Sequence, residues 1–404
     1  MLKLLCYLKR NIPFYDKYIP NDILNSINET YGKIIFESLP VIDRSIVNNN
    51  FEDFISSSFP RKLLVEIKSQ VGDTTKEYRY VADGIEYWVE CTSGTTGMPL
   101  IIIKSTEERV KLGASLWRMR RKFSDVLPEE LFCFMHNKKG GYPFPIDEIN
   151  LEYKKIKELQ FLEKQRYKWW HVFPVQLEKY VEYISSFEIL LQNLEVIECN
   201  GAFISRSDMQ RYSEIFNCRV ANNYGCREVW NIAYSCRQGN LHLNDDNIIF
   251  ELIDSEGEVI SNPYQIGEIV VSSKNLKVMP FIRYKTGDYG FYEEGGCCAD
   301  VSKVINLDTN RNRIMGTNLC GTDVFRTVIF DLQHEYGINK FESINVVQDK
   351  INEFKVFVRN CSENRNVFEV VFEKNVTRVL NRKIICHFEY DVLKEHKSLF
   401  VAIK

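Results

Sequence analysis

The sequence has no run of residues that approaches the roughly 20 apolar positions of a membrane-spanning helix. Near its start, Lys3 and the pair Lys9-Arg10 interrupt the apolar residues before the hydrophobic stretch of a secretion signal develops. It also lacks a basic block, and its net charge of −3 argues against nucleic acid as the main partner. These absences predict a cytoplasmic protein that acts on a small molecule and binds neither membrane nor nucleic acid.

Internal repeats and low-complexity tracts are absent as well. The 12 cysteines are spread through 404 residues. Without a secretion signal, this distribution favours reduced thiols, either free or bound to a metal, over a disulfide framework. A chain of this length can bury a large core and is typical of two or three structural units.

The most informative segment is the run Cys91-Thr92-Ser93-Gly94-Thr95-Thr96-Gly97-Met98-Pro99. It lies between two β-prone stretches at 87–89 and 100–103. Glycines let backbone N–H groups close around an anion, and hydroxyls add donors, so the run predicts a loop that binds nucleotide phosphates. The Gly-Lys-Ser/Thr ending of the P-loop is missing, and so is the spacing of a dinucleotide-binding turn. Composition alone is equally compatible with a simple hairpin loop.

Three later segments give this loop a context. They are Asn222-Asn223-Tyr224-Gly225-Cys226-Arg227-Glu228, Arg283-Tyr284-Lys285-Thr286-Gly287-Asp288 and Asn310-Arg311. In order and spacing, the four segments together resemble the adenylate-forming superfamily, which includes acyl-CoA synthetases and the adenylation domains of peptide synthetases. The resemblance extends over nearly the whole chain.

Within that superfamily, the chain is most similar to the branch of phenylacetate-CoA ligases and related capsule-biosynthesis ligases. There, the aromatic-Gly segment is followed by a Cys, a Gly-x-His, an acidic pair and a strand. The matching residues here are Cys236, Gly239, His242, Asp245-Asp246 and 248–252, and 11–15 resembles the opening of the branch.

An α/β architecture is expected from both the pattern and the resemblance. The apolar runs 194–199 and 218–220 flank a helix-like segment at 207–216, which predicts a layered domain with a largely parallel sheet. Another helix is expected over 107–123, after the loop. A smaller β-subdomain is predicted to begin at 269–273.

Past Arg311 the pattern changes to strand-like runs at 344–347, 354–358 and 368–372 and a basic helix-like stretch at 377–383. These runs predict a small α+β unit. The expected organisation is therefore a multi-subdomain adenylation domain over 1–311 and a small mobile C-terminal domain over 312–404.

By this resemblance, the hydroxyls of Thr92, Ser93, Thr95 and Thr96 hold the β- and γ-phosphates of ATP, with Gly94 and Gly97 in the same loop. Glu228 coordinates Mg²⁺, and Asp288 accepts hydrogen bonds from both ribose hydroxyls with help from Arg311. Thr96 is counted with Glu228 among the catalytic residues. The adenine site is assigned to Gly201, Ala202, Asn223, Tyr224 and Gly225.

A lysine near the C-terminus reaches the α-phosphate in this superfamily. The matching residue is Lys397, with Lys394 as the alternative. A glycine usually precedes that lysine, and here it is His396. Because a long cationic side chain on a mobile domain neutralises charge only when the domain closes, Lys397 is predicted to be catalytic.

Cys236, His242, Cys297 and Cys298 form a second set of candidates. Several members of the branch carry Cys and His at these places, and thiolates with imidazole suit tetrahedral Zn²⁺. The branch has alternate cysteines where this chain has adjacent ones, so joint ligation by Cys297 and Cys298 needs a turn. Structural zinc and buried unligated thiols both remain open.

The leading hypothesis is an ATP-dependent ligase that activates an aryl or acyl carboxylic acid as its adenylate and releases pyrophosphate. The acyl group then passes to a thiol, either CoA or a carrier-protein phosphopantetheine, or to an amine. The alternative is a non-catalytic descendant that binds nucleotide or acts as a scaffold. Retention of the loop, Glu228 and Asp288 favours the enzyme.

Overall fold

The computed structural model describes the chain apart from several segments and single residues. The longer gaps are 71–76, 93–99, 134–167, 182–192, 309–313, 316–320, 392–399 and 403–404, and the short ones are 173, 175–176, 178–179, 202–203, 295, 299, 301, 335, 339 and 342. Candidate residues Ser93, Gly94, Thr95, Thr96, Gly97, Ala202, Arg311 and Lys397 lie outside the described residues.

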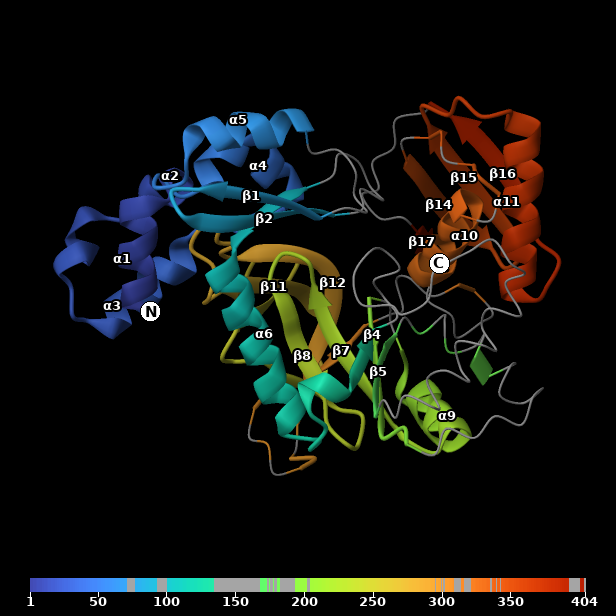
Figure 1. Ribbon diagram of the computed structural model, residues 1–404, viewed down its shortest axis with the longest axis horizontal. Helices are drawn as coiled ribbons and strands as arrows, with labels where there is room; N and C mark the ends of the chain where they lie inside the picture. Colours follow the sequence, from blue (N-terminus) through green and yellow to red (C-terminus); the bar gives the residue numbers. More distant parts are fainter. Residues whose placement is uncertain are drawn as a thin grey trace.

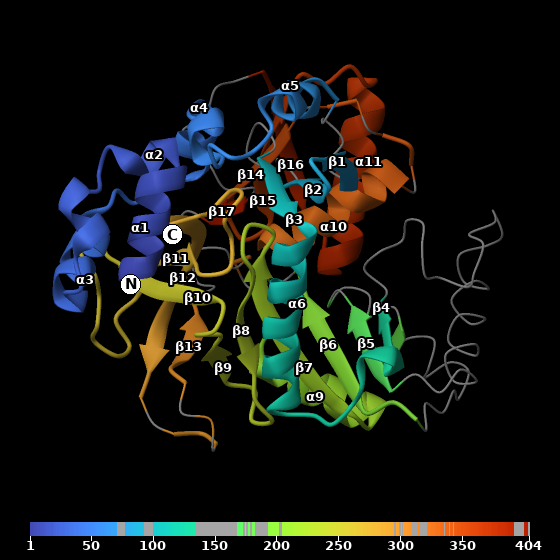
Figure 2. The same cartoon turned by 60° about the vertical axis from the view of Figure 1, so that its left-hand side comes forward.

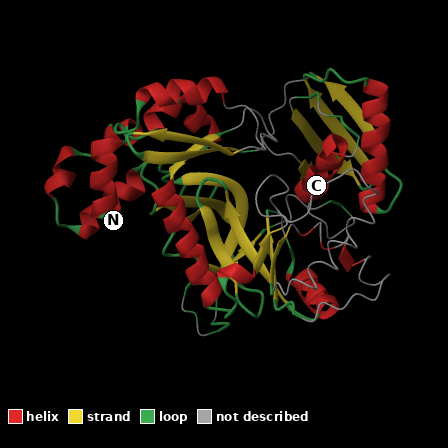
Figure 3. Cartoon of the chain, in the orientation of Figure 1, coloured by secondary structure: helices red, strands yellow, loops and turns green. Residues whose placement is uncertain are grey.

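The N-terminal segment, residues 2–70, is helical (Figure 3). Its elements are α1 (Leu2–Asn11), α2 (Pro13–Asp16), η1 (Asn21–Asn25), α3 (Glu29–Ser38), α4 (Arg44–Asn49), η2 (Phe51–Phe54) and α5 (Arg61–Gln70). Their apolar faces share a core with strands of the two sheets that follow. The Tyr15 hydroxyl, fully buried, bonds to the backbone of Ile282 and joins this group to the large sheet.

A three-stranded antiparallel sheet holds the two ends of the predicted phosphate loop. It comprises β1 (Glu77–Ala82), β2 (Ile85–Cys91) and β3 (Ile101–Ser105). Register pairs Cys91 with Ile101, so the loop is the connection of a β-hairpin. Ser105 ends β3 and also begins α6 (Thr106–Arg121) through a capping box with Glu108, which confirms the helix expected after the loop.

Among the described residues, the main sheet has ten strands in the order β10-β11-β12-β13-β9-β8-β7-β6-β5-β4. Figure 1 shows β11, β12, β8 and β7 of this sheet below the three-stranded one. Their bounds are β4 (Leu131–Cys133), β5 (Trp169–Val172), β6 (Val196–Asn200), β7 (Arg219–Cys226), β8 (Trp230–Ser235), β9 (Leu241–Leu243), β10 (Ile248–Ile253), β11 (Gly267–Ser273), β12 (Tyr284–Glu293) and β13 (Val304–Leu307). A short helix, η3 (Pro128–Glu130), precedes β4.

Two sequence expectations about this sheet are wrong. Only β4 to β7 are parallel, and every other neighbouring pair is antiparallel, so the sheet is mixed rather than largely parallel. The strand at 269–273 does not begin a separate subdomain, because β13 pairs with β9 and continues the same sheet. Strand pairing is a long-range property, and the apolar pattern of one strand does not encode its neighbour.

Helices cover both faces of the parallel strands. On one face, α6 packs over the sheet (Figure 2). On the other lies α9 (Arg206–Phe216), which confirms the helix expected at 207–216. Alternation along the strands divides the buried side chains between these faces: Trp169, Val196 and Ala221 join α6, and Trp170, Ile197 and Val220 join α9.

The C-terminal unit is smaller and has its own hydrophobic core. Its four-stranded sheet has the order β16-β15-β14-β17. The elements are α10 (Gly321–His334), β14 (Ser343–Lys350), β15 (Glu353–Arg359), α11 (Arg365–Leu380), β16 (Ile385–Tyr390) and β17 (Phe400–Ala402). The mixed α/β fold with a smaller C-terminal domain is as expected, while the boundary at 311/312 stays a prediction.

The strand predicted at 368–372 is wrong, because these residues lie in the middle of α11. The Asn364 side chain accepts a hydrogen bond from Val367 N and begins the helix. Buried residues then recur every four positions, at Phe368, Phe372, Val376 and Leu380. A short apolar run cannot distinguish strand from helix until this longer period is counted.

Among the described residues, no helix is both long and apolar enough to span a bilayer.

Candidate functional site

The tertiary structure brings two of the sequence segments together through a pair of tyrosines. From β7, the Tyr224 hydroxyl donates to Asp288 Oδ2 at 2.9 Å. From β12, the Tyr284 hydroxyl donates to Glu228 Oε1 at 2.8 Å. The two bonds cross between the segments, so each tyrosine orients a candidate carboxylate carried by the other segment.

Exposure separates the two carboxylates. Asp288 is exposed to solvent, whereas Glu228 is only 4% exposed. Burial raises the pKa of Tyr224 well above its ordinary value, and Asp288 adds to this shift. Burial and then Glu228 likewise raise the pKa of Tyr284. Both phenols therefore keep their protons at neutral pH and act as donors to the carboxylates.

The base of the phosphate loop joins the same cluster. At the two ends of the loop, Thr92 N donates to Leu100 O at 3.0 Å. Leu100 N also donates to the Thr92 hydroxyl at 3.1 Å. Next to this pair, Arg227 Nη1 donates to the carbonyl of Cys91. The loop base is thereby bound to the residue that precedes Glu228.

Two glycines of the predicted adenine site have conformational or steric reasons to be glycine. A Cβ added at Gly225 would lie 2.0 Å from Trp230 O, because the strand register shifts there and the chains approach closely. Gly201 has a φ of +76°, which glycine adopts without strain. Gly201 follows the last residue of β6, and Asn200 pairs in register with Asn223 on β7.

The side chain of Asn223, a predicted adenine-site residue, lies in a buried polar cluster. Its side-chain amide donates to Glu198 Oε1 at 2.9 Å and accepts from Asn231 at 2.7 Å. Tyr224 on the same strand instead bonds to Asp288. Adjacent residues of a strand point to opposite faces, so the Asn223 side chain supports the strand from the face opposite Tyr224.

Glu198 is the centre of a buried polar network that the sequence analysis missed. Arg120 binds it with two hydrogen bonds, Nε to Oε2 at 2.8 Å and Nη2 to Oε1 at 2.7 Å. Tyr234 also donates to it at 2.9 Å, and His171 Nε2 lies 3.4 Å away. Burial alone would raise the pKa of Glu198, but Arg120, His171 and the hydrogen bonds lower it to about 2.

Sequence carried a weak signal for this network and none for its partners. Glu198 is one of two glutamates, with Glu195, inside the run 194–199, and a buried carboxylate requires a partner. Arg120 looks like one of several basic residues at the end of a helix. Only the packing of α6 on β6 makes them a pair.

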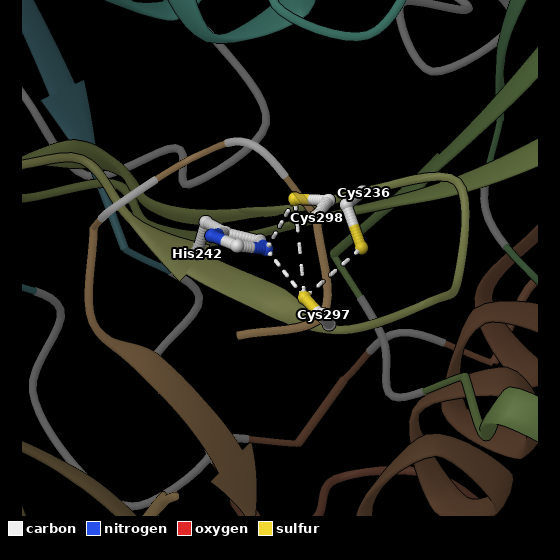
Figure 4. Close-up of side chains that lie close together, drawn as sticks. All are labelled: Cys236, His242, Cys297 and Cys298. Atoms are coloured by element: carbon white, nitrogen blue, oxygen red, sulfur yellow. Dashed lines mark hydrogen bonds between the residues drawn. The ribbon is translucent and has the colours of Figure 1, made fainter. Parts of the chain in front are cut away.

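Four candidate metal ligands also meet. The ligand atoms of Cys236, His242, Cys297 and Cys298 all lie within 4.8 Å of one another (Figure 4). Cys297 Sγ lies 3.7 Å from Cys236 Sγ, 3.0 Å from His242 Nε2 and 3.9 Å from Cys298 Sγ. The adjacent cysteines thus both approach the histidine, because Cys298 Sγ lies 3.4 Å from His242 Nε2.

The donor set fits zinc in type and in spacing. Two thiolates bound to one tetrahedral Zn²⁺ at about 2.3 Å lie about 3.8 Å apart, close to the sulfur separations here. On its other nitrogen, Nδ1, His242 faces Ser302 Oγ at 3.4 Å and Asp300 Oδ1 at 3.8 Å. Such a polar partner commonly orients a metal-bound histidine.

Without an ion, the two inner thiols differ in acidity. Burial would raise the pKa of Cys236, but hydrogen bonds, first from His242, lower it to about 6. Burial raises the pKa of Cys297 to about 11, and the neighbouring Cys236 sulfur adds to that shift. One thiolate is therefore favoured in the cluster before any metal binds.

The overall fold matches crystal structures of a 2-hydroxyisobutyryl-CoA ligase. The complex with 2-HIB-AMP and CoA in the thioesterification state has a TM-score of 0.59 and 13% identity, over 99% of this chain and 87% of that chain. The postadenylation state with 2-HIB-AMP has a TM-score of 0.57 and 13% identity, over 100% and 88%. An open conformation has a TM-score of 0.55 and 12% identity, over 100% and 89%.

The chain therefore has the fold of the adenylate-forming ligases. At this level of identity, the match extends to the fold and not to a substrate. No family model matches the sequence, and no curated protein matches it either. The phenylacetate-CoA ligase branch remains a prediction from the sequence motifs.

Proposed function

We propose that this protein is an ATP-dependent carboxylate-activating ligase. In the first step, a substrate carboxylate oxygen bonds to the α-phosphorus of ATP, the bond from that phosphorus to the bridging oxygen breaks, and pyrophosphate leaves. In the second step, an acceptor thiol or amine attacks the acyl carbon, AMP leaves, and the acceptor proton passes to solvent. The observation that carries this proposal is the convergence of the loop base, Glu228 and Asp288 through Arg227 and the two tyrosines.

Each converging group suits one part of ATP. The loop residues Thr92 to Gly97 would bind the β- and γ-phosphates through N–H and hydroxyl donors. Glu228 would hold Mg²⁺, which neutralises phosphate charge when bound. The exposed Asp288, fixed by Tyr224, would accept both ribose hydroxyls. We keep Arg311 and Lys397 in their predicted roles at the hinge and the α-phosphate.

CoA is the first acceptor to test. The ligase whose fold this chain shares was captured with both an acyl-adenylate and CoA. A carrier-protein phosphopantetheine offers the same thiol chemistry, and an amine would give an amide. We propose a thiol as the acceptor and an aryl or small acyl acid as the substrate.

The function is tested by pyrophosphate release with ATP and Mg²⁺ across a panel of aryl, fatty, hydroxy and amino acids. Hydroxylamine traps the adenylate as a hydroxamate, so the first step is measured without any acceptor. Acid-dependent pyrophosphate and hydroxamate in equal amounts would support the proposal. ATP binding without turnover across the panel would favour a non-catalytic nucleotide-binding protein.

Replacing Asp288 with alanine is expected to weaken ATP binding at least about 10-fold, because two hydrogen bonds to a charged acceptor are lost. Calorimetric titration with ATP and Mg²⁺ measures this. Asp288→Asn keeps an acceptor for Tyr224 and should have an intermediate effect. The matched control is Asp254→Ala in an exposed turn. Unchanged affinity in Asp288→Ala would contradict the ribose assignment.

We also propose a structural zinc ion bound by Cys236, His242, Cys297 and Cys298. The support is the donor set, its spacing and the polar partners of His242. The ligands join the β8–β9 hairpin to the segment after β12. A bound ion would crosslink these strands in the absence of a disulfide.

Protein purified without added metal is expected to contain about one zinc per chain. Cys236→Ser should lose most of this zinc and lower the melting temperature, as should removal of the ion by a chelator. Elemental analysis and thermal unfolding measure these effects. Cys361→Ser, outside the cluster, is the matched control. If the wild-type protein contained no zinc and Cys236→Ser had an unchanged melting temperature, the thiols would be unligated.

A further inference from the structure

A lysine that the resemblance leaves without a role is completely buried beside the candidate site. Lys104 is on β3, and its exposed fraction is 0%. Its ammonium donates to the main-chain carbonyl of Arg227 at 2.8 Å and lies 3.4 Å from Glu90 Oε2. Taking an ammonium out of water is costly unless its hydrogen bonds are replaced, so these two contacts are the reason that it is tolerated.

Glu90, the carboxylate partner, is itself held from a second side. Arg109 on α6 lies 3.3 Å from Glu90 Oε1. Its guanidinium also stacks on Trp88, 4.0 Å from the ring centroid. Glu90, the counter-ion of Lys104, is therefore paired both with β3 and with α6. This pairing restricts where the Lys104 ammonium can lie.

Arg227 closes the connection from the other direction. Its guanidinium bonds to the carbonyl of Cys91, the last residue of β2. Its own carbonyl receives the Lys104 ammonium from β3. Both strands that carry the phosphate loop are thus tied to one residue, and the next residue in the chain is Glu228.

We propose that Lys104 and Arg227 are positioning residues that hold the ends of β2 and β3, which flank the phosphate loop, in register with the Glu228 carboxylate. This inference rests on the proposed function, because it assumes that loop and carboxylate act on the same phosphates. Neither side chain is assigned a catalytic contact. A displacement of about 1 Å between such groups is enough to cost about 100-fold in rate.

Arg227 also gives the connection a specific form. The guanidinium of Arg227 reaches from the residue before Glu228 to the carbonyl of Cys91 at the end of β2. A long side chain with several donors in a planar group suits such a contact. Lys104 makes the second contact of the connection. Arg227 binds the carbonyl of Cys91 at the loop base, and Lys104 binds the main-chain carbonyl of Arg227 beside Glu228.

The test compares Lys104→Met, Glu90→Gln/Lys104→Met and Arg227→Met with the wild-type protein. The double variant also removes the carboxylate charge that Lys104→Met would leave buried without its lysine partner. Lys111→Met, in an exposed pair with Glu107, controls for loss of a lysine near the same strands. Calorimetry measures ATP affinity as a function of Mg²⁺, and pyrophosphate release gives KM for ATP and for the acid separately.

All three test variants are expected to need at least about 10-fold more Mg²⁺ for half-maximal ATP binding. KM for ATP should rise with it, while KM for the carboxylic acid changes less than about twofold. Variants whose KM values both match the wild type and whose kcat falls only with the folded fraction would overturn the proposal. A merely structural role would give this result, in which both KM values are unchanged and kcat falls only with the folded fraction.

Failure of the proposed function has a separate signature. A wild-type protein that binds ATP but turns over no acid contradicts the ligase, while the Mg²⁺ dependence of binding still tests the positioning role. A wild-type protein that binds no ATP overturns both. If Lys104→Met does not fold, Arg227→Met decides, because the Arg227 side chain is exposed and its replacement removes the other half of the connection.

Discussion

Glu228→Gln is expected to slow adenylate formation by at least about 100-fold, because the proposed Mg²⁺, which would neutralise phosphate charge, would lose its carboxylate ligand. Glutamine has the same shape, and its carbonyl oxygen can still accept the bond from Tyr284. The substitution therefore removes charge while it leaves the hydrogen bond and the packing of a 4% exposed side chain in place. Pyrophosphate release at saturating ATP and acid, measured over a range of Mg²⁺ concentrations, gives the effect.

Two controls separate this loss from a general disturbance of the sheet. Glu268→Gln removes another glutamate of the same sheet, which is paired with Lys285 at 2.8 Å. Tyr284→Phe removes the hydroxyl that orients Glu228 and should cause a smaller loss than Glu228→Gln. Wild-type rates in Glu228→Gln at every Mg²⁺ concentration would rule out the metal assignment.

Glu198→Gln is expected to have the largest effect on stability, about 3–5 kcal/mol, because it leaves the Arg120 guanidinium buried without a counter-charge. The pH dependence points the same way. The pKa of Glu198 falls from 4.5 to about 2 on folding. Its ionised form therefore adds about 3 kcal/mol at neutral pH. That contribution is present above pH 4.5 and is lost as pH falls towards 2.

Urea denaturation at several pH values, followed by tryptophan fluorescence, measures both effects. The wild-type protein should lose stability between pH 4.5 and 2 more steeply than Glu198→Gln does. Arg120→Met/Glu198→Gln should be more stable than Glu198→Gln alone, since no unpaired cation remains. Asp246→Asn, which breaks the exposed pair with Arg118, should change little. Equal acid sensitivity in wild type and Glu198→Gln would contradict the ionised state of Glu198.

Local patterns in the sequence were sufficient for several parts of the fold. The helix after the phosphate loop and α9 follow from apolar periodicity and from capping residues, Ser105 and Ser205. Within α11, residues 368–372 are wrongly predicted as a strand because they form a short apolar run, while the helix-like stretch predicted at 377–383 overlaps the end of this helix. Strand order was beyond reach, since pairing such as that of β13 with β9 joins residues far apart in the chain.

The candidate site divides in the same way. Motifs single out Tyr224, Glu228 and Asp288 as candidates, because motif recognition needs only residue type and order along the chain. They did not identify Tyr284 as the group that orients Glu228, nor Lys104 and Arg227 as the link to the loop. Those roles depend on which side chains meet across strands, and the sequence of one strand does not determine which residues of other strands it contacts.

By itself the sequence determined the chemical inventory of this protein: a hydroxyl-rich and glycine-rich loop, two carboxylates, and four thiol and imidazole groups. The tertiary structure alone decided how they are combined. In the folded chain, each of two tyrosines bonds to the carboxylate of the other segment, and Lys104 is buried against Arg227 O. Folding also brings the ligand atoms of Cys236, His242, Cys297 and Cys298 within 4.8 Å of one another. The physical reason is that residue types are local, whereas burial, hydrogen bonding and charge pairing arise only when distant segments pack together.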